Sequence, residues 1–208
     1  MRDVVIVYGG DSVENEISAQ SGQGILKNID QSKFCASLLN IKDLKVDLIK
    51  QGTVIFIAVH GLGGEDGETQ KLLANNGIKF TGSGEDSAKL CWDKISSKAL
   101  MQKNNIPTPP HKIIRKDEKL DLKDQFFASR ESLFVKPNSN GSSFGVSKVT
   151  DFKLLDQAVE EARKFSEDVI IEEAYNLAEY TVGVLKGEAL EPLEIIANDN
   201  KGLSLIHI

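Results

Sequence analysis

The chain has few of the residue types that crosslink or rigidify a protein. Its 208 residues include 2 cysteines, 5 prolines and 1 tryptophan. Cys35 and Cys91 make neither a disulfide framework nor a metal-binding pattern, and we expect both to be reduced thiols. At this length folding buries roughly 70% of the surface of the unfolded chain, so the core needs no covalent staple.

Long hydrophobic runs are also missing. The run at residues 54–59 is far shorter than the ~20 residues that a membrane-spanning helix needs. The apolar run at residues 4–8 is too short for the core of a signal peptide, and Gly9 and Gly10 follow it in place of a cleavage site. We therefore expect a cytoplasmic protein with no membrane partner.

A basic excess is absent as well. Lysine and arginine total 25 against 31 for aspartate and glutamate, which gives a formal net charge of −6. Proteins that bind nucleic acids usually carry a basic excess, so we expect no nucleic-acid partner, although a local cationic pocket for an anionic ligand stays open. The 40% of hydrophobic and 27% of charged residues are typical of an ordinary globular protein.

The first part of the chain alternates β-branched runs with helical spacing. This alternation of strand and helix patterns predicts an α/β unit with a mostly parallel sheet. The expected strands cover residues 4–8, 36–41 and 54–59. The expected helices run from Asp11 or Ser12 to Asn28 and over residues 69–76. Helical spacing then covers residues 86–104, until prolines at 107, 109 and 110 make an extended connector.

The pattern of the second part of the chain predicts an antiparallel α+β unit. Asp151 caps one amphipathic helix, in which apolar residues recur at helical spacing from Phe152 to Phe165. Strands are expected on both sides of it, at residues 133–136, 146–149, 169–172, 179–185 and 189–196. The fold class is therefore α/β followed by α+β.

Two glycine-containing turns follow strands of the first part, at the end of an open α/β sheet where ligands bind. Glu14 follows the turn at Gly9 and Gly10, and it is either a carboxylate for a cationic group or a solvated residue of a capping turn. His60 precedes a loop with four glycines in residues 61–67, a density that favours close backbone approach. No dinucleotide fingerprint is present, which disfavours a nicotinamide-dependent oxidoreductase.

Two segments of the second part have the composition of a nucleotide site. Lys136 ends a strand, and the Gly/Ser loop at residues 137–145 either holds phosphate oxygens or connects a hairpin. Glu172 and Glu173 end another strand, and Glu179 follows. These carboxylates either bind an adenine amino group and a ribose or form a polar strand end.

These segments, in this order, resemble the D-alanine–D-alanine ligases of the ATP-grasp superfamily from residue 4 to about residue 196. The resemblance rests on Gly9-Gly10-x-Ser12-x-Glu14, the His60 loop, residues 81–84, Trp92-Asp93-Lys94, and Lys136-Pro137 with Gly141-Ser142-Ser143. It implies that ATP phosphorylates the carboxylate of one D-alanine. The amine of a second D-alanine then attacks the acyl phosphate, which yields D-alanyl-D-alanine for peptidoglycan synthesis.

The resemblance also implies roles for single residues. Glu14 would hold the ammonium of the first D-alanine, with His60 beside the same subsite and Ser142 orienting Glu14. The phosphates of ATP would be bound by Lys94, Lys136 and Ser143.

The nucleoside would be bound by the strand that ends at Glu172. Glu172 itself would face adenine, and the backbone of Glu173 and Tyr175 would contact the edge of the base. Glu179 would bind the ribose hydroxyls.

The resemblance further implies three domains. Residues 1–88 would bind substrate, residues 89–176 would form the first ATP-grasp subdomain, and residues 177–208 would begin a second one that is incomplete at its C-terminal end. The family uses Mg²⁺ or Mn²⁺, but we find no counterpart of its metal ligands in this chain. We therefore expect a truncated ligase without turnover, and a homodimer through the N-terminal domain.

Some residues depart from the family pattern. Asn140 stands where the family more often has Glu, with the bulky Phe144 nearby, and Glu173 stands where it often has Lys. Two other functions stay open: a ligase that joins D-alanine to D-lactate or D-serine, and a non-catalytic ATP-binding module.

Overall fold

A computed structural model describes residues 1–175 and 177–196 of the chain. They form two compact units. The first unit comprises Met1–Thr108 together with Asn138–Gly141, and the second comprises Pro109–Pro137 and the described residues from Ser142 onward. None of the helices among the described residues is both long and apolar enough to cross a membrane.

The first unit is built on a parallel sheet of four strands in the order β2-β1-β3-β4. The strands are β1 (Arg2–Tyr8), β2 (Phe34–Asn40), β3 (Val54–Ile57) and β4 (Lys79–Phe80). Val4 and Ile6 of β1 pack on one face of the sheet, and Val5 and Val7 pack on the other. Because both faces are covered, residues 4–7 of β1 are all apolar. The parallel pairing of the four strands confirms the predicted parallel sheet.

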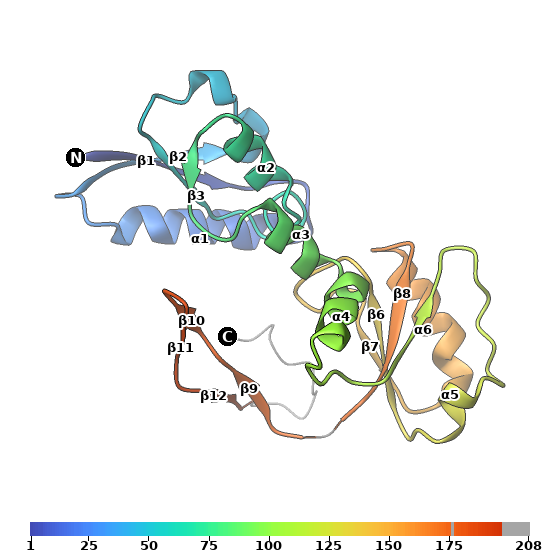
Figure 1. Cartoon of the computed structure of the whole chain (residues 1–208). Coiled ribbons are helices and arrows are strands. Elements are labelled where there is room, and N and C mark those ends of the chain that lie inside the picture. The colour runs from blue at the N-terminus through green and yellow to red at the C-terminus, as the bar shows by residue number, and fades with distance from the viewer. Residues whose placement is uncertain (176, 197–208) are drawn as a thin grey trace. The chain divides into compact units, whose positions relative to one another are not determined.

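One helix covers each face of this sheet (Figure 1). The helix α1 (Asn15–Asn28) packs closely because Gly22 faces β1, where a side chain would come within 3.0 Å of Tyr8 Cβ. Helix α2 (Glu68–Asn75) contributes Leu73 to the core on the opposite face. The predicted start of α1 at Asp11 or Ser12 is wrong, because residues 11–14 form a turn and the Ser12 hydroxyl bonds to a carbonyl outside the helix.

The helical stretch predicted at residues 86–104 is two helices. They are α3 (Glu85–Trp92) and α4 (Lys94–Lys103), and between them Asp93 is extended, with φ −89° and ψ 102°. The Asp93 carboxylate accepts a bond of 2.7 Å from the backbone N–H of Ser96, so a capping residue begins α4 where an uninterrupted helix was expected.

The second unit contains an antiparallel sheet in the order β5-β8-β6-β7. Its strands are β5 (His111–Ile114), β6 (Leu133–Pro137), β7 (Ser147–Val149) and β8 (Val169–Glu173). The strand β5 and the short helix α5 (Gln125–Ala128) were not predicted, since four residues are too few to show a period. The predicted α/β plus α+β fold class is confirmed.

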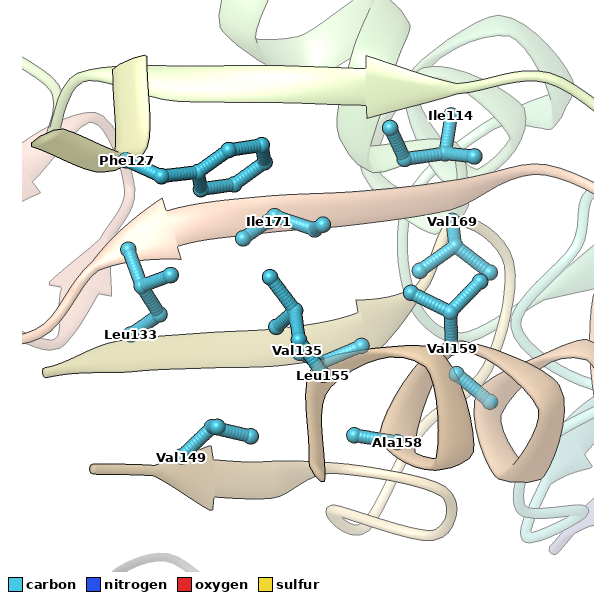
Figure 2. Close-up of a cluster of buried hydrophobic side chains, with 11 residues drawn as sticks. Ile114, Phe127, Leu133, Val135, Val149, Leu155, Ala158, Val159, Val169 and Ile171 are labelled. Carbon is cyan, nitrogen blue, oxygen red and sulfur yellow. The ribbon is translucent and has the colours of Figure 1, made fainter. Parts of the chain in front are cut away.

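The core of this unit lies between one face of the sheet and helix α6 (Leu155–Arg163), as Figure 2 shows. Val135 and Ile171 are paired in register and fully buried. Leu155 and Val159 of α6 pack against the same cluster. A 3-10 turn, Phe152–Leu154, precedes α6, so the regular helix begins four residues after the capping Asp151.

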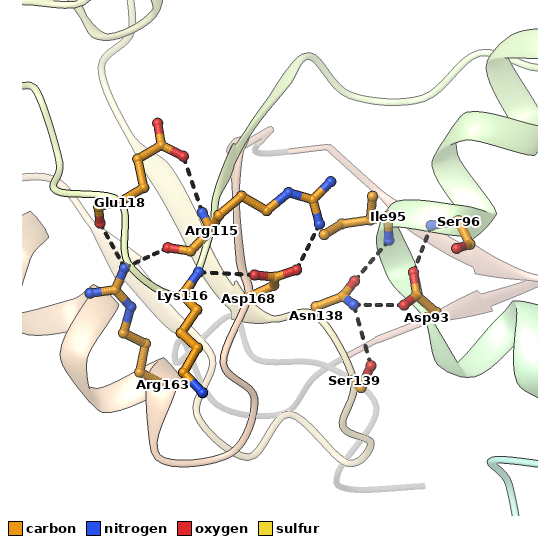
Figure 3. A network of polar contacts seen from close by, with 10 residues as sticks. All are labelled: Asp93, Ile95, Ser96, Arg115, Lys116, Glu118, Asn138, Ser139, Arg163 and Asp168. Carbon is orange, nitrogen blue, oxygen red and sulfur yellow. Dashed lines mark hydrogen bonds and ion pairs between the residues drawn. The ribbon is translucent and has the colours of Figure 1, made fainter.

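A polar network at the surface of the second unit joins β5 to the turn before β8 (Figure 3). Arg163 donates bonds of 2.9 and 2.8 Å to the carbonyls of Arg115 and Glu118. Asp168 accepts from the side chain of Arg115 at 2.6 Å and from the backbone of Lys116 at 3.0 Å. These bonds hold a charged loop that lies outside the core.

The strands predicted at residues 179–185 and 189–196 are shorter pieces. They are β9 (Glu179–Thr181), β10 (Val184–Leu185), β11 (Glu188–Ala189) and β12 (Leu193–Ile195). Lys186 and Gly187, both at positive φ, make the turn between β10 and β11. The tail at residues 203–208 lies outside the described residues. The predicted domain boundaries at residues 88 and 176 rest on the resemblance and stay predictions.

We expect Leu155→Ala to lower the free energy of unfolding by about 3 kcal/mol, because it opens a cavity under α6. Leu155 has no exposed surface, whereas its neighbour Leu154 is 55% exposed. Leu154→Ala is therefore the matched control, with an expected loss of about 0.5 kcal/mol or less. Urea unfolding measures both values, and equal losses would contradict the packing described here.

Candidate functional site

Glu14 is buried at the carboxyl end of β1, where only 3% of its surface is exposed. Its backbone N–H donates to the Ser12 hydroxyl at 3.3 Å, and that hydroxyl donates to the carbonyl of His60 at 2.8 Å. The two glycine-containing segments of the first unit are therefore joined by a hydrogen bond. A buried carboxylate in this turn excludes the alternative of a solvated capping residue.

His60 is held between two side chains that sequence reasoning missed. Ser21 Oγ of α1 lies 3.0 Å from His60 Nε2, and Glu65 Oε1 lies 3.8 Å from His60 Nδ1. Ser21 faces the ring because it lies two turns after Glu14 on the same side of α1. The sequence signal that could have identified Glu65 is its position five residues after His60 in a glycine-rich loop.

Gly141 lies close to two acidic side chains of the first unit. A side chain at Gly141 would come within 3.4 Å of a carboxylate oxygen of Glu14 and of Glu65. At Gly61 it would come within 2.7 Å of the Glu14 carboxylate. Gly61 also has a φ of 70°, so this position favours glycine. At Gly141 a side chain would make an ordinary contact with the two carboxylates. The start of the Gly/Ser loop thus meets the Glu14 turn inside the first unit.

Lys94, the first residue of α4, is fixed to the same loop. Its Nζ donates to the carbonyls of Asn138 and Asn140, at 3.4 and 2.7 Å. The Asn138 side chain accepts from the backbone of Ile95 at 2.9 Å and donates to Asp93 at 2.8 Å. Trp92-Asp93-Lys94 therefore positions the loop as well as presenting a lysine.

In the second unit Lys136 and Glu172 form an ion pair of 2.6 Å between Nζ and Oε2. Register explains the pair: Val135 and Ile171 face the core, so the next residue on each strand faces the opposite side of the sheet. Only 9% of the Glu172 side chain is exposed. The carboxylate lies near enough to the ammonium to balance its charge.

Two more residues on this face were missed. Phe134 pairs with Glu172 on one side and with Lys148 on the other. The Nζ atoms of Lys136 and Lys148 lie 5.5 and 5.9 Å from the centroid of the Phe134 ring. An aromatic ring with two ammonium groups and a carboxylate can contact a base and anionic oxygens. Strand alternation was the signal that could have found Phe134.

Ser142 and Ser143 have φ of 48° and 57°, in the left-handed region. Gly145 shares this region with φ 74°. Such conformations cost a non-glycine residue about 1 kcal/mol or more, and they recur where a loop binds a ligand. The loop connects the antiparallel strands β6 and β7 as a hairpin, and it is a strained turn with hydroxyl and backbone donors.

The end of β8 carries the last predicted side chains. Glu173 forms an ion pair of 3.4 Å with Arg130, a residue that sequence reasoning missed. Desolvation, followed by the nearby Glu173 carboxylate, raises the pKa of the Tyr175 phenol. Glu179 begins β9, where it pairs with Ile195.

The predicted site residues thus form two groups. Glu14, His60 and Lys94 lie in the first unit, and the second unit holds the others: Lys136, Ser142, Ser143, Glu172, Glu173, Tyr175 and Glu179. Among residues 1–175 and 177–196, no cluster of three or more His, Cys, Asp or Glu side chains could hold a metal ion. The described side chains therefore do not fit the metal that the resemblance implies, and we derive no step through it.

Comparisons with known proteins show what the chain is similar to. Residues 100–202 match the family model "D-ala D-ala ligase C-terminus". A D-alanine–D-alanine ligase of Citrifermentans bemidjiense is 36% identical over 197 residues, which cover 94% of this chain and 63% of that protein. One of Methylacidiphilum infernorum is 33% identical over 194 residues, covering 93% and 62%. The chain thus spans just under two thirds of the length of these relatives.

Solved structures share the fold. The D-alanine–D-alanine ligase of Bacillus anthracis has a TM-score of 0.85 at 31% identity, with 94% of this chain and 65% of that chain covered. Its complex with ATP has a TM-score of 0.82 at 29% identity, with 94% and 67% covered. The VanG D-Ala:D-Ser ligase of Enterococcus faecalis has a TM-score of 0.75 at 25% identity, with 93% and 68% covered.

The relatives match both units, and the structural likeness extends along nearly the whole chain. By sequence and by fold, the chain belongs to the family of the D-alanine–D-alanine ligases.

Proposed function

We propose that the chain binds ATP and D-alanine and serves the ATP-dependent ligation of two D-alanines. In this reaction the γ-phosphoryl group of ATP passes to the carboxylate of the first D-alanine. The amine of the second D-alanine attacks the acyl carbon, phosphate leaves, and D-alanyl-D-alanine forms. Catalysis of this kind depends on positioning and charge balance more than on covalent chemistry by the protein.

The observation that carries the proposal is the approach of Gly141 to Glu14. The Gly/Ser loop has the donors for phosphate oxygens, and Glu14 is a buried carboxylate suited to an ammonium group. A reaction between the carboxylate of an amino acid and a γ-phosphate needs these two groups at neighbouring positions. The start of the loop, at Gly141, lies next to the Glu14 carboxylate, which supports that arrangement.

The contacts of the two lysines support nucleotide binding. Lys136 is balanced by Glu172 on the sheet face that also carries Phe134, and Lys94 bonds to carbonyls at the start of the loop. Each ammonium group is thereby held in place before a phosphate arrives. We assign Glu172 to the adenine amino group and Glu179 to the ribose, with Ser142 orienting Glu14 and Ser143 donating to the γ-phosphate.

Finer points of the proposal come from the resemblance alone. They are delivery of ATP with Mg²⁺, a role in peptidoglycan precursor synthesis, a cytoplasmic location and a homodimer through the N-terminal domain. Sedimentation of the purified chain tests the last of these directly.

A second candidate is ligation of D-alanine to D-serine. The likeness to the VanG D-Ala:D-Ser ligase favours it, since its TM-score is 0.75 over 93% of this chain. The side chains discussed above serve ATP and the first D-alanine, which both reactions share. Competition between D-serine and D-alanine for the second position distinguishes the two candidates.

We expect Glu14→Gln to weaken D-alanine binding about 10-fold or more, because the neutral amide loses the charge-assisted bond to the ammonium group. Glu16→Gln is the matched control, since Glu16 is exposed in the first turn of the same helix. Calorimetric titration with D-alanine, at a saturating concentration of a non-hydrolysable ATP analogue, measures both. ATP binding without D-alanine binding by the wild-type chain would favour a non-catalytic module.

We expect Lys136→Met to weaken ATP binding about 10-fold or more, because it removes a phosphate-binding cation and leaves the buried Glu172 without this partner. Lys136→Arg keeps the charge and should retain most of the affinity. Lys119→Met removes an exposed lysine from a loop of the same unit and is the control. Titration with ATP reads out all three, and unchanged affinity in Lys136→Met places the phosphates elsewhere.

A further inference from the structure

A pocket of the first unit lies at the amino ends of β1, β3 and β4, and we call it the amino-end pocket. Its volume is about 560 Å³, and all the residues that line it belong to the first unit. Because these strands are parallel, Glu14 and His60 follow the carboxyl ends of β1 and β3, roughly 20 Å away along the sheet. The amino-end pocket is therefore separate from the candidate site.

Three cations line the amino-end pocket, and no acidic residue does. The cations are Arg2 of β1, Lys50 of the turn before β3, and Lys79 of β4. Within the part of the chain that the structure describes, none of the three forms an ion pair. The acidic Asp3 lines a smaller adjoining pocket of about 230 Å³, but it is not paired with Lys50 among the described contacts. In a chain with a net charge of −6, this pocket has the opposite sign and attracts anions.

A buried hydroxyl lines the same pocket. Only 5% of the surface of Thr53 is exposed, and its hydroxyl makes no hydrogen bond to another residue of the described parts of the chain. A threonine hydroxyl can donate one hydrogen bond, and such bonds are stronger when the acceptor is an anionic oxygen. Thr53 therefore adds a neutral donor to the three cations.

The backbone around the pocket is held by two glycine turns. The N–H of Thr53 donates to the carbonyl of Lys50 at 3.1 Å, and Gly52 between them has the positive φ, 86°, that this kind of turn requires. Gly77 ends α2 with a φ of 65°. Ile49, which also lines the pocket, packs against the core of the first unit. The pocket is thus formed before a ligand arrives, which lowers the cost of binding.

We propose that the amino-end pocket is a second ligand site, which binds a small molecule with two phosphate groups. Its volume lies in the range of ~300–1,000 Å³ that is usual for small-molecule sites. Strand β3 separates β1 from β4, so the backbones of Arg2 and Lys79 lie roughly 10 Å apart, and two anionic groups match these cations better than one. Guanidinium and ammonium groups bind phosphate oxygens through charge-assisted hydrogen bonds, which favours phosphate over an apolar compound.

The test is a titration of the full chain with inorganic pyrophosphate, followed by the NMR chemical shifts of backbone amide groups. Low ionic strength is used, because salt screens exposed charges. We expect the amides of Gly52, Thr53 and Gly77 to shift and to saturate together. The amides of Ser142 and Ser143 report binding at the candidate nucleotide site in the same experiment. Shifts confined to these two serines, or no shift at all, would overturn the inference.

The triple variant Arg2→Gln, Lys50→Gln, Lys79→Gln removes the three cations of the pocket. All three side chains are exposed, so we expect the variant to fold. Pyrophosphate binding, measured at the pocket amides, should weaken about 10-fold or more, because the charge-assisted bonds are lost. Binding measured at the two serines should stay unchanged.

The matched control is the triple variant Lys27→Gln, Lys45→Gln, Lys103→Gln. It removes the same charge from exposed lysines of the first unit that do not line the pocket. Its affinity at the pocket amides should stay within about twofold of the wild-type value. Equal losses in the two triple variants would show a general attraction by net charge and would overturn the inference. The affinity for ATP tests the proposed function separately, and both triple variants should keep it.

Discussion

The ion pair between Lys136 and Glu172 depends on the register of β6 and β8, and the candidate nucleotide site depends on the same register. With Val135 opposite Ile171, alternate residues of these strands join the core cluster that includes Leu155 of α6, whereas Lys136 and Glu172 face the other way. A slip of one residue would bury the lysine and expose the core. The same register therefore packs the core and places the charged side chains on the opposite face of the sheet. The pair is partly buried, so its value lies in fixed geometry more than in stability.

In the second unit, strand register positions the charged side chains of the candidate site. In the first unit, glycines have this role, because they let the backbone lie close to Glu14. The backbone at Gly61 and at Gly141 lies near the buried Glu14, and a side chain at Gly61 would come within 2.7 Å of its carboxylate. Asn138, anchored to Asp93, brings the start of the loop to α4. The Gly/Ser loop therefore has a fixed beginning in the first unit and a strained continuation at Ser142 and Ser143 in the second. A loop of this construction can bind phosphate through its backbone with little further ordering.

The sequence predicts most of the fold because its strongest patterns are long or doubly buried: β1, α1 and α6 were all expected, within a few residues at their ends. The elements that escaped prediction are those that tertiary contacts decide, such as β5, a four-residue strand stabilised by its pairing with β8. The site follows the same rule. Glycines and strand-end charges mark Glu14, His60 and Lys136, but Ser21 and Phe134 belong to no local motif. They join the site through helix facing and strand alternation, which only the folded chain reveals.

The central claim is that the chain binds both a nucleotide, through Lys136 and the Gly/Ser loop, and an amino acid, through Glu14. A crystal structure of the chain with a non-hydrolysable ATP analogue and D-alanine tests it most directly. We expect the triphosphate at Lys136 and the loop of Ser142 and Ser143, the base at the end of β8, and the ammonium group of D-alanine at Glu14. A nucleotide bound away from the Lys136 face of the sheet, or D-alanine bound away from Glu14, would contradict the claim.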